Sequence, residues 1–98
     1  MTYYLGFTPS AKEDIRLLKE SRHLQKQYNA VKKSLNFLVA NPKHPSLQTH
    51  QYYSLQGPDG EKVFEAYAEQ DTSAAYRIFF YYGPDRGEIV IAAITPHP

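Results

Sequence analysis

The stretch AYRIFFYYGPDRGEIVIAAI, residues 75–94, decides the fold. It contains two runs of mostly aromatic and β-branched residues, 75–82 and 88–94, and these residue types favour strands. The residues between them, Gly83 to Gly87, form a turn signal that contains a proline. We therefore predict two antiparallel strands joined by this turn. The second run is apolar at every position from Ile89 to Ile94, which predicts a central strand with both faces covered.

The segments before this pair extend it into a meander. Lys62–Ala68 are predicted to form a further strand. The sequence Gly57-Pro58-Asp59-Gly60 in front of it is a strong turn signal. Asn41–Ser54 carries two prolines and several polar residues, so we interpret it as a connecting loop that leads into a short strand near Tyr52–Leu55.

The N-terminal segment is predicted to be a strand followed at once by a helix. Thr2–Thr8 alternates aromatic and small residues, which predicts a short strand that ends at Pro9. Ser10 can cap the helix through its hydroxyl, and Glu13 is spaced to complete a capping box. The apolar residues of this helix then fall on one face: Ala11, Ile15 and Leu18.

A second helix follows after a short turn at residues 20–23. It is predicted from an apolar stripe at helical spacing: Leu24, Tyr28, Val31, Leu35 and Leu38. The helix should stop near Asn41, because Pro42 disfavours helical geometry in the residue before it. The order is β-α-α-β-β-β. We predict one α+β domain over residues 1–98, with a helical hairpin packed on one face of an antiparallel sheet.

The composition is that of a folded chain without bound groups. The chain is 42% hydrophobic and 14% aromatic, which is too apolar for a disordered protein. It has no cysteine, and its four histidines lack the spacing of metal ligands, so neither a metal nor another cofactor is expected. No stretch has the length of a signal peptide core or a membrane span, so we expect a cytoplasmic protein without membrane contact.

The charges are unevenly distributed although the formal net charge is only +1. From Ser10 to Lys33 seven basic residues outnumber three acidic ones, and this excess could attract ribosomal RNA or an acidic protein segment. From Asp59 to Asp71 five acidic residues stand against Lys62 alone. The acidic stretch opposes the binding of nucleic acid there unless nearby cations compensate.

Three motifs occur in this order along the chain: NPKHPSL at 41–47, AYRIFF at 75–80 and IAAITPH at 91–97. Together with the β-α-α-β-β-β order they resemble the RelE/ParE superfamily of bacterial toxins. The resemblance covers nearly the whole chain. It implies the toxin of a type II toxin–antitoxin pair, which either cuts messenger RNA in the ribosomal A site or inhibits DNA gyrase. It also implies an antitoxin protein that binds and neutralises the toxin.

The resemblance implies three catalytic residues. Arg77 lies where the family's strand arginine lies, and a guanidinium suits a phosphate with developing charge. His97 matches the C-terminal histidine of one nuclease subgroup and could act as general acid. His50 falls near the position of that subgroup's glutamate base. Alternatively, Arg77 is a surface arginine that pairs with a strand neighbour such as Glu65 or Glu88, and the two histidines are solvated.

Substrate contacts are predicted around Arg77. Strand alternation puts Phe79 and Tyr81 on its face, where they could stack on RNA bases or pack against a partner chain. Several ribosome-dependent relatives place cations on the preceding strand, and the corresponding positions here are near Glu65 and Tyr67. Lys62 is the cation that could compensate.

Two classes of function follow from these features. In the first, the protein is a ribosome-dependent mRNA endonuclease that uses Arg77, His97 and His50. In the second, it has the toxin fold but no competent site, and it binds an antitoxin peptide, gyrase or itself through the Phe79 and Tyr81 surface. The predicted strand Lys62–Ala68 distinguishes them, because a nuclease should display cations where this chain has Glu65.

Overall fold

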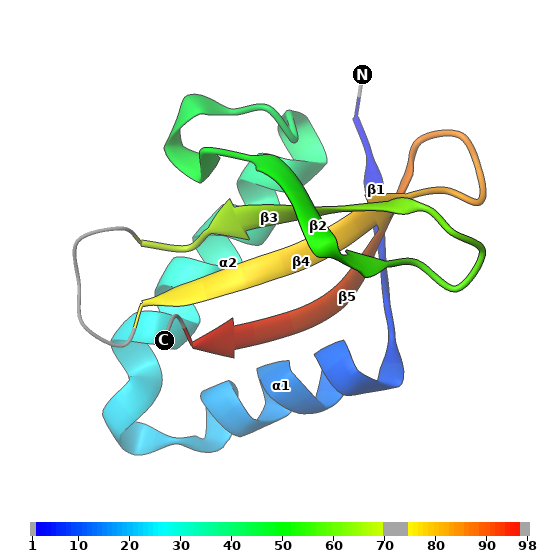
Figure 1. Ribbon diagram of the computed structural model, residues 1–98. Coiled ribbons are helices and arrows are strands. Elements are labelled where there is room, and N and C mark those ends of the chain that lie inside the picture. The colour runs from blue at the N-terminus through cyan, green and yellow to red at the C-terminus, as the bar shows by residue number, and fades with distance from the viewer. Residues whose placement is uncertain (1, 70–74, 97–98) are drawn as a thin grey trace.

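The computed structural model describes residues 2–69 and 75–96 (Figure 1). Its order over these residues is β-α-α-β-β-β-β, one strand more than the predicted β-α-α-β-β-β, because the short strand expected near Tyr52–Leu55 is a full member of the sheet. The helices are α1 (Pro9–Glu20) and α2 (Gln25–Ala40), with short 3₁₀ turns at Arg22–Leu24 and Pro45–Leu47. The strands are β1 (Tyr4–Phe7), β2 (His50–Gln56), β3 (Lys62–Tyr67), β4 (Tyr76–Tyr82) and β5 (Glu88–Pro96). As predicted, α2 ends at Asn41, whose amide donates to the Phe37 carbonyl at 2.7 Å.

The five strands of the described chain form one sheet in the order β1-β5-β4-β3-β2. The meander from β2 to β5 is antiparallel, as predicted. The prediction of a wholly antiparallel sheet is wrong at one edge, because β1 pairs with β5 in parallel. The helical hairpin carries the chain from β1 to the opposite edge, and the meander brings β5 back beside β1 with the same direction. The fold is therefore α+β with a mixed sheet.

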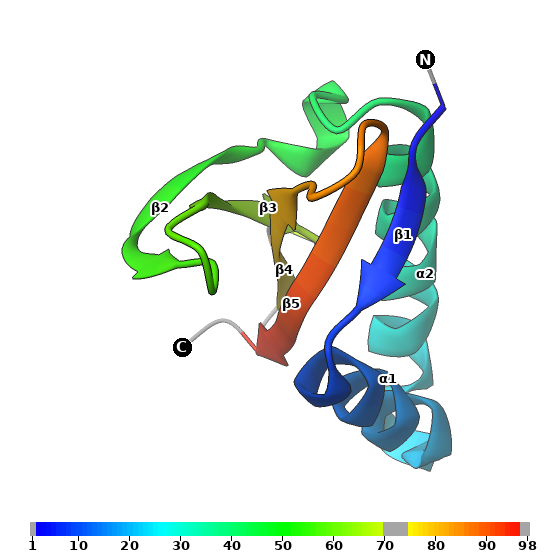
Figure 2. The same ribbon diagram turned by 90° about the vertical axis from the view of Figure 1, so that its right-hand side faces the viewer.

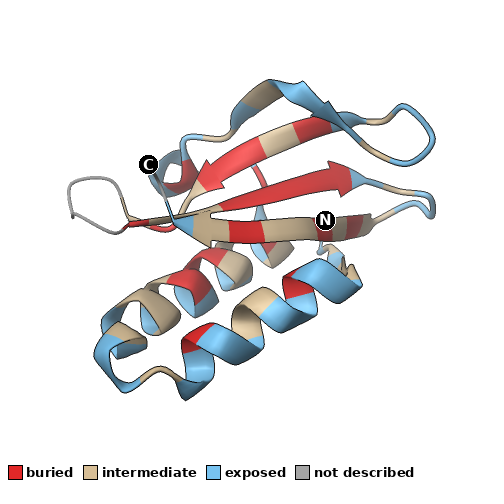
Figure 3. Cartoon of the chain, turned by 60° about the horizontal axis from the view of Figure 1, so that its bottom comes forward, coloured by how far each residue is buried: buried red, intermediate tan, exposed pale blue. Residues whose placement is uncertain are grey.

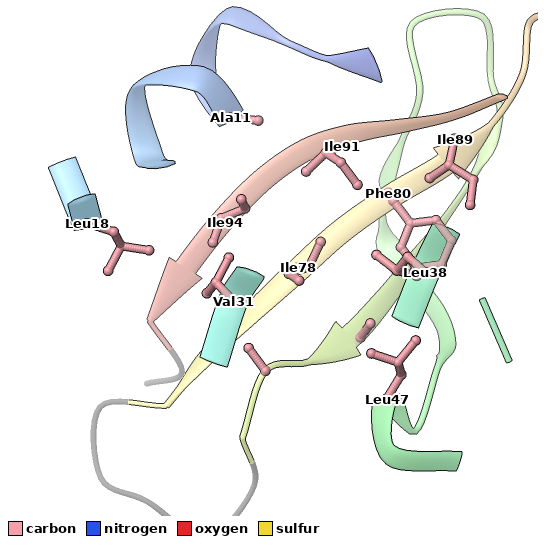
Figure 4. Packing of buried hydrophobic residues seen from close by; sticks show 12 residues of the cluster. Ala11, Leu18, Val31, Leu38, Leu47, Ile78, Phe80, Ile89, Ile91 and Ile94 are labelled. Carbon is pink, nitrogen blue, oxygen red and sulfur yellow. The ribbon is translucent and has the colours of Figure 1, made fainter. Parts of the chain in front are cut away.

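Both helices pack against the same face of the sheet (Figure 2). Figure 3 shows their buried positions turned toward the strands and their exposed positions turned away. Figure 4 shows side chains from helices and strands meeting between the two layers. The core comprises Ala11, Leu18, Val31, Leu38, Leu47, Ala66, Ala68, Ile78, Phe80, Ile89, Ile91 and Ile94. This single layer of aliphatic and aromatic side chains joins the helical hairpin to the sheet.

Strand β4 separates two apolar clusters, as its alternation predicts. Ile78 and Phe80 point into the helix-covered core, whereas Phe79 and Tyr81 belong to a second cluster on the outer face, the face without helices. The outer face of β5 is only half covered, since Val90 is half-buried. The prediction of a central β5 with both faces covered is therefore wrong in part: β4 is the middle strand, and β5 has one fully buried face.

Helix α1 begins at a threonine that also holds β5. The Thr8 hydroxyl accepts a hydrogen bond from the Ala11 amide at 3.1 Å and donates to the Ala92 carbonyl at 2.8 Å. The predicted capping box is wrong, because Ser10 lies inside the helix and Glu13 pairs with Arg16 instead. Threonine before a proline at the first helical position is itself a local start signal, so the sequence offered this cap as well, whereas the bond to β5 is not visible in it.

Substitution of Thr8 by valine should lower the free energy of unfolding by about 1–2 kcal/mol, because it removes both the cap and the bond to β5. The matched control is Ser10→Ala, which should change stability by less than about 0.5 kcal/mol. Urea denaturation of both variants measures the difference. A larger loss for Ser10→Ala than for Thr8→Val would mean that the helix is capped where the sequence pattern places the cap.

Candidate functional site

Three strands bring His50, Glu65 and Arg77 together on the outer face of the sheet. His50 of β2 lies opposite Glu65 of β3, and Tyr67, two residues further along β3, lies opposite Arg77 of β4. One Glu65 carboxylate oxygen is 2.8 Å from His50 Nε2, and the other is 2.7 Å from Arg77 Nη1. A single carboxylate therefore joins two side chains that the sequence resemblance assigns to catalysis.

Glu65 is the most buried member of this cluster. The residue is 3% exposed, whereas the side chains of Arg77 and His50 are 19% and 47% exposed. A buried carboxylate is strongly unfavourable unless it is paired and hydrogen-bonded, and here both of its oxygens are occupied. Glu65 therefore supports the Arg77 and His50 side chains from the interior, while their outer edges remain open to solvent.

Aromatic rings hold the guanidinium of Arg77 in place. Its central carbon lies 4.9 Å from the ring centroid of Phe79 and 5.8 Å from that of Tyr52, distances at which a cation is attracted to a ring. The two rings contact each other edge to face at 4.9 Å. Arg77 Nε is buried and has no hydrogen-bond partner among the described residues. The side chain is thus fixed by stacking and by its ion pair with Glu65.

Both ring nitrogens of His50 contact oxygen atoms. Nδ1 lies 2.9 Å from the Gln48 carbonyl oxygen, and Nε2 lies 2.8 Å from Oε1 of Glu65. These two contacts fix the orientation of the ring beside Glu65 and Arg77.

Tyr67 lies beside the same carboxylate. Its ring centroid is 5.7 Å from that of His50. Burial, the negative charge of Glu65 and a hydrogen bond to Glu65 raise the pKa of the Tyr67 phenol, and the charge of Arg77 opposes this effect. Tyr67 therefore faces the cluster as a neutral hydroxyl.

The structure places the predicted site residues unequally. Arg77 and His50 come together. His50 is the first residue of β2, whereas the sequence predicted that it lies in the loop before that strand. The alternative pairing of Arg77 with Glu65 is confirmed. His97 lies outside the described residues.

The predicted substrate contacts lie in different surroundings. Phe79 contacts Arg77 but is 4% exposed, and Tyr81 is 8% exposed, with a pKa raised mainly by burial. Lys62 shares the helix-side face with Phe64 by strand alternation, and so it does not compensate the charge of Glu65. The sequence analysis missed Tyr52, since its role depends on the register of β2 against β3, which is irregular after Gln51.

The arrangement can bind and polarise a phosphate group. Arg77 has further N–H groups besides the one bound to Glu65, and His50 is exposed enough to exchange protons with a ligand. Within residues 2–69 and 75–96, no group of three or more His, Cys, Asp or Glu side chains could hold a metal ion. Over the same residues, neither helix is long and apolar enough to cross a membrane.

Comparisons with known proteins identify the fold. No family model and no curated protein matches the chain. A structure of the YoeB dimer from Staphylococcus aureus superposes with a TM-score of 0.68 at 15% identity, covering 100% of both chains. The RelE–RelB complex from Pyrococcus horikoshii gives 0.65 at 14% identity, covering 98% of this chain and 96% of that chain. The DinJ–YafQ toxin–antitoxin complex from E. coli gives 0.66 at 16% identity, covering 99% and 94%.

The fold and the site define a small α+β protein with a charged cluster on the open face of its sheet. More particularly, the chain has the fold of the RelE, YoeB and YafQ toxins, as the three sequence motifs indicated.

Removal of Arg77 should be costly because Glu65 is buried. Arg77→Ala removes the ion pair of the carboxylate, which keeps only His50 and Tyr67 as neighbours, and should lower the free energy of unfolding by about 3 kcal/mol. Glu65→Gln keeps an acceptor for Arg77 and should cost only about 1 kcal/mol. In the Glu65→Gln background, Arg77→Ala should then cost at least 1 kcal/mol less. Denaturant titration of the four proteins measures this coupling, and additive losses would show that the ion pair contributes nothing.

The Tyr67 phenol reports directly on Glu65. A neighbouring carboxylate disfavours phenolate, so Glu65→Gln should lower the pKa of Tyr67. Glu61→Gln is the matched control: Glu61 raises the pKa of Tyr81, so this variant should lower the pKa of Tyr81 and leave Tyr67 unchanged. NMR titration of protein labelled with ¹³C at tyrosine Cζ resolves both. An unchanged Tyr67 in the Glu65→Gln variant would place Glu65 away from the phenol.

Proposed function

We propose that this protein is the toxin of a type II toxin–antitoxin system and acts as a ribosome-dependent mRNA endonuclease in the cytoplasm. The observation that carries the proposal is the meeting of His50 and Arg77 on one buried carboxylate at the open face of the sheet. The fold supports it, since three of the solved structures that the chain resembles are a toxin or a toxin–antitoxin complex by title.

The proposed reaction needs no group beyond the protein. The 2′-hydroxyl of a ribose attacks the adjacent phosphorus and loses its proton, and the departing 5′-oxygen gains one, which leaves a 2′,3′-cyclic phosphate. Arg77 stabilises the charge that develops on the phosphate oxygens. In its neutral form, His50 accepts the proton of the 2′-hydroxyl at Nε2 after its half-exposed ring turns away from Glu65, and His97 supplies the proton to the leaving oxygen. Glu65 keeps Arg77 and His50 in position.

A toxin of this kind requires an antitoxin, and we infer one here. Two of the similar structures are complexes by title, RelE with RelB and YafQ with DinJ. A short protein with an acidic segment would suit this chain, because basic residues outnumber acidic ones from Ser10 to Lys33.

One observation favours a second candidate function. Glu65 already neutralises Arg77, and the two aromatic residues predicted to stack on RNA, Phe79 and Tyr81, are buried in the outer cluster. A protein with such a site could bind an antitoxin peptide, gyrase or a second copy of itself without cleaving RNA. The experiment below distinguishes the two candidates.

Controlled expression of Arg77→Lys in a bacterial host tests the proposal. Lysine keeps a cation beside Glu65, so the variant should fold, but it lacks the planar fork that matches a phosphate. We expect the wild type to arrest growth and to produce new 5′ ends phased to codons. Arg77→Lys should reduce cleavage about 100-fold or more. Growth curves and sequencing of 5′ ends measure both effects in the same cultures.

The matched control is Arg86→Lys, since Arg86 is exposed in the turn between β4 and β5. This variant should cleave as the wild type does. Growth arrest without new 5′ ends would support the binding function against the nuclease. Unimpaired growth with soluble wild-type protein would contradict a toxin role in that host.

A further inference from the structure

A groove opens beside His50, on the side of the sheet that carries the helices. It has a volume of about 640 Å³ and lies between the segment that precedes β2 and the ends of β1, β3 and β4. Figure 1 shows that segment folded back over the end of α2, close to the start of β1. The volume lies within the range of sites that bind small molecules.

Aromatic rings form one side of the groove. Tyr3, Phe64 and Tyr82 line it, and the ring of Tyr82 lies 6.1 Å from that of Tyr3 and 5.5 Å from that of Phe64. Tyr82 is 37% exposed, which is unusual for a large ring at the end of a central strand. Burial is the main cause that raises the pKa of its phenol. An open ring next to a partly desolvated hydroxyl is a surface on which a planar ligand can stack.

The opposite side of the groove is formed by the segment before β2, which hydrogen bonds and ring stacking hold in place. The Thr49 hydroxyl donates to the Pro42 carbonyl at 2.6 Å, and the His44 ring stacks on Phe37 at 4.1 Å. Gln48 has a φ of 47°, in the left-handed region that residues other than glycine rarely adopt. Strained backbone that its surroundings hold in place is characteristic of ligand sites.

The rim of the groove is basic. Lys43, His44 and His50 line it, and its lining contains no carboxylate. The Nδ1 atom of His44 accepts a hydrogen bond from the Ser46 amide at 3.1 Å, so its proton is on Nε2, and that nitrogen is a donor. A second hollow, of about 460 Å³, shares Tyr3, Lys43 and Tyr82 with the groove. Lys43 thus lies between two hollows that use the same two rings.

We propose that this groove binds single-stranded RNA next to the phosphate held by Arg77. One base stacks on Tyr82 and Tyr3, and Lys43 with His44 binds the phosphate that links it to the next nucleotide. His50 lies on the edge strand β2 and belongs to both the groove and the Glu65 cluster, so an RNA strand that crosses the cluster reaches the groove by passing round this edge. The inference rests on the proposed function, because it names where the neighbouring nucleotides of that substrate bind.

RNA fits the groove better than an acidic peptide does. Two hollows on either side of one lysine match the alternation of base and phosphate along a strand, and stacking accepts any base. An acidic peptide would use the cations but leave the open ring of Tyr82 without a partner of matching shape.

Binding of a five-nucleotide RNA with a 2′-O-methyl group on each ribose, so that it cannot be cut, tests the groove. We expect amide shifts at Tyr3, Lys43, His44 and Tyr82 in NMR spectra of the wild-type protein made by cell-free synthesis. The double variant Lys43→Ala/Tyr82→Leu should bind about tenfold more weakly. The matched control, Lys19→Ala/Tyr53→Leu, removes an exposed lysine and an exposed tyrosine that do not line the groove, and should bind as the wild type does.

The proposal that the groove binds RNA would be overturned if the two double variants bound the RNA with equal affinity. It would also be overturned if the amide shifts were confined to residues around Arg77. Shifts in the groove caused by a poly-glutamate peptide but not by the RNA would also overturn it. The proposed nuclease function fails separately: if the wild type produces no new 5′ ends in cells while the oligonucleotide binds in the groove, only the cleavage is refuted. The thermal unfolding of both double variants confirms that they are folded.

Discussion

The parallel pairing of β1 with β5 is the constraint on which the rest of the structure depends. β1 and β2 lie at opposite ends of the strand order, so the chain between them must cross the whole sheet. The two helices make this crossing, and a crossing of this kind covers one face only (Figure 2). Among the described residues, the outer face carries a small apolar cluster. For that reason the charged side chains of β2, β3 and β4 can lie there half open, where a ligand can reach them.

On that outer face, Glu65 couples stability to function. A carboxylate that is 3% exposed requires its partners, and the partners are the two residues that a nuclease would use, Arg77 and His50. The ion pair therefore reduces the net charge available to a phosphate, but it also fixes the position of both side chains before any ligand arrives. Preorganisation of this kind lowers the cost of binding and catalysis. Loss of activity on removal of Arg77 is thus informative only when the variant keeps a cation beside Glu65.

Local patterns predicted most of the fold, and non-local contacts account for the errors. Alternation placed Phe79 and Tyr81 on the face of Arg77, and the apolar stripes gave both helices. The pairing of β1 joins residues more than 80 positions apart and leaves no local signal. The bond from the Thr8 hydroxyl to a β5 carbonyl is likewise non-local and leaves no signal in the sequence. In the site, the sequence analysis offered the pairing of Glu65 with Arg77 as one of two alternatives. The contact of Tyr52 with Arg77 could not be predicted, because it depends on the register of β2, which periodicity does not give.

The acidic stretch from Asp59 to Asp71 is the strongest objection that the sequence raises against RNA binding, and the structure weakens it. Asp59 and Glu61 lie near Tyr81, whose pKa they raise, in the turn between β2 and β3. Glu65 is buried and paired with Arg77 and His50, so it presents little negative charge to solvent. The local net charge of a segment is therefore a poor guide to the potential at this site. What a phosphate would meet at the open face is the outer edge of Arg77 and His50, with their counter-charge behind them.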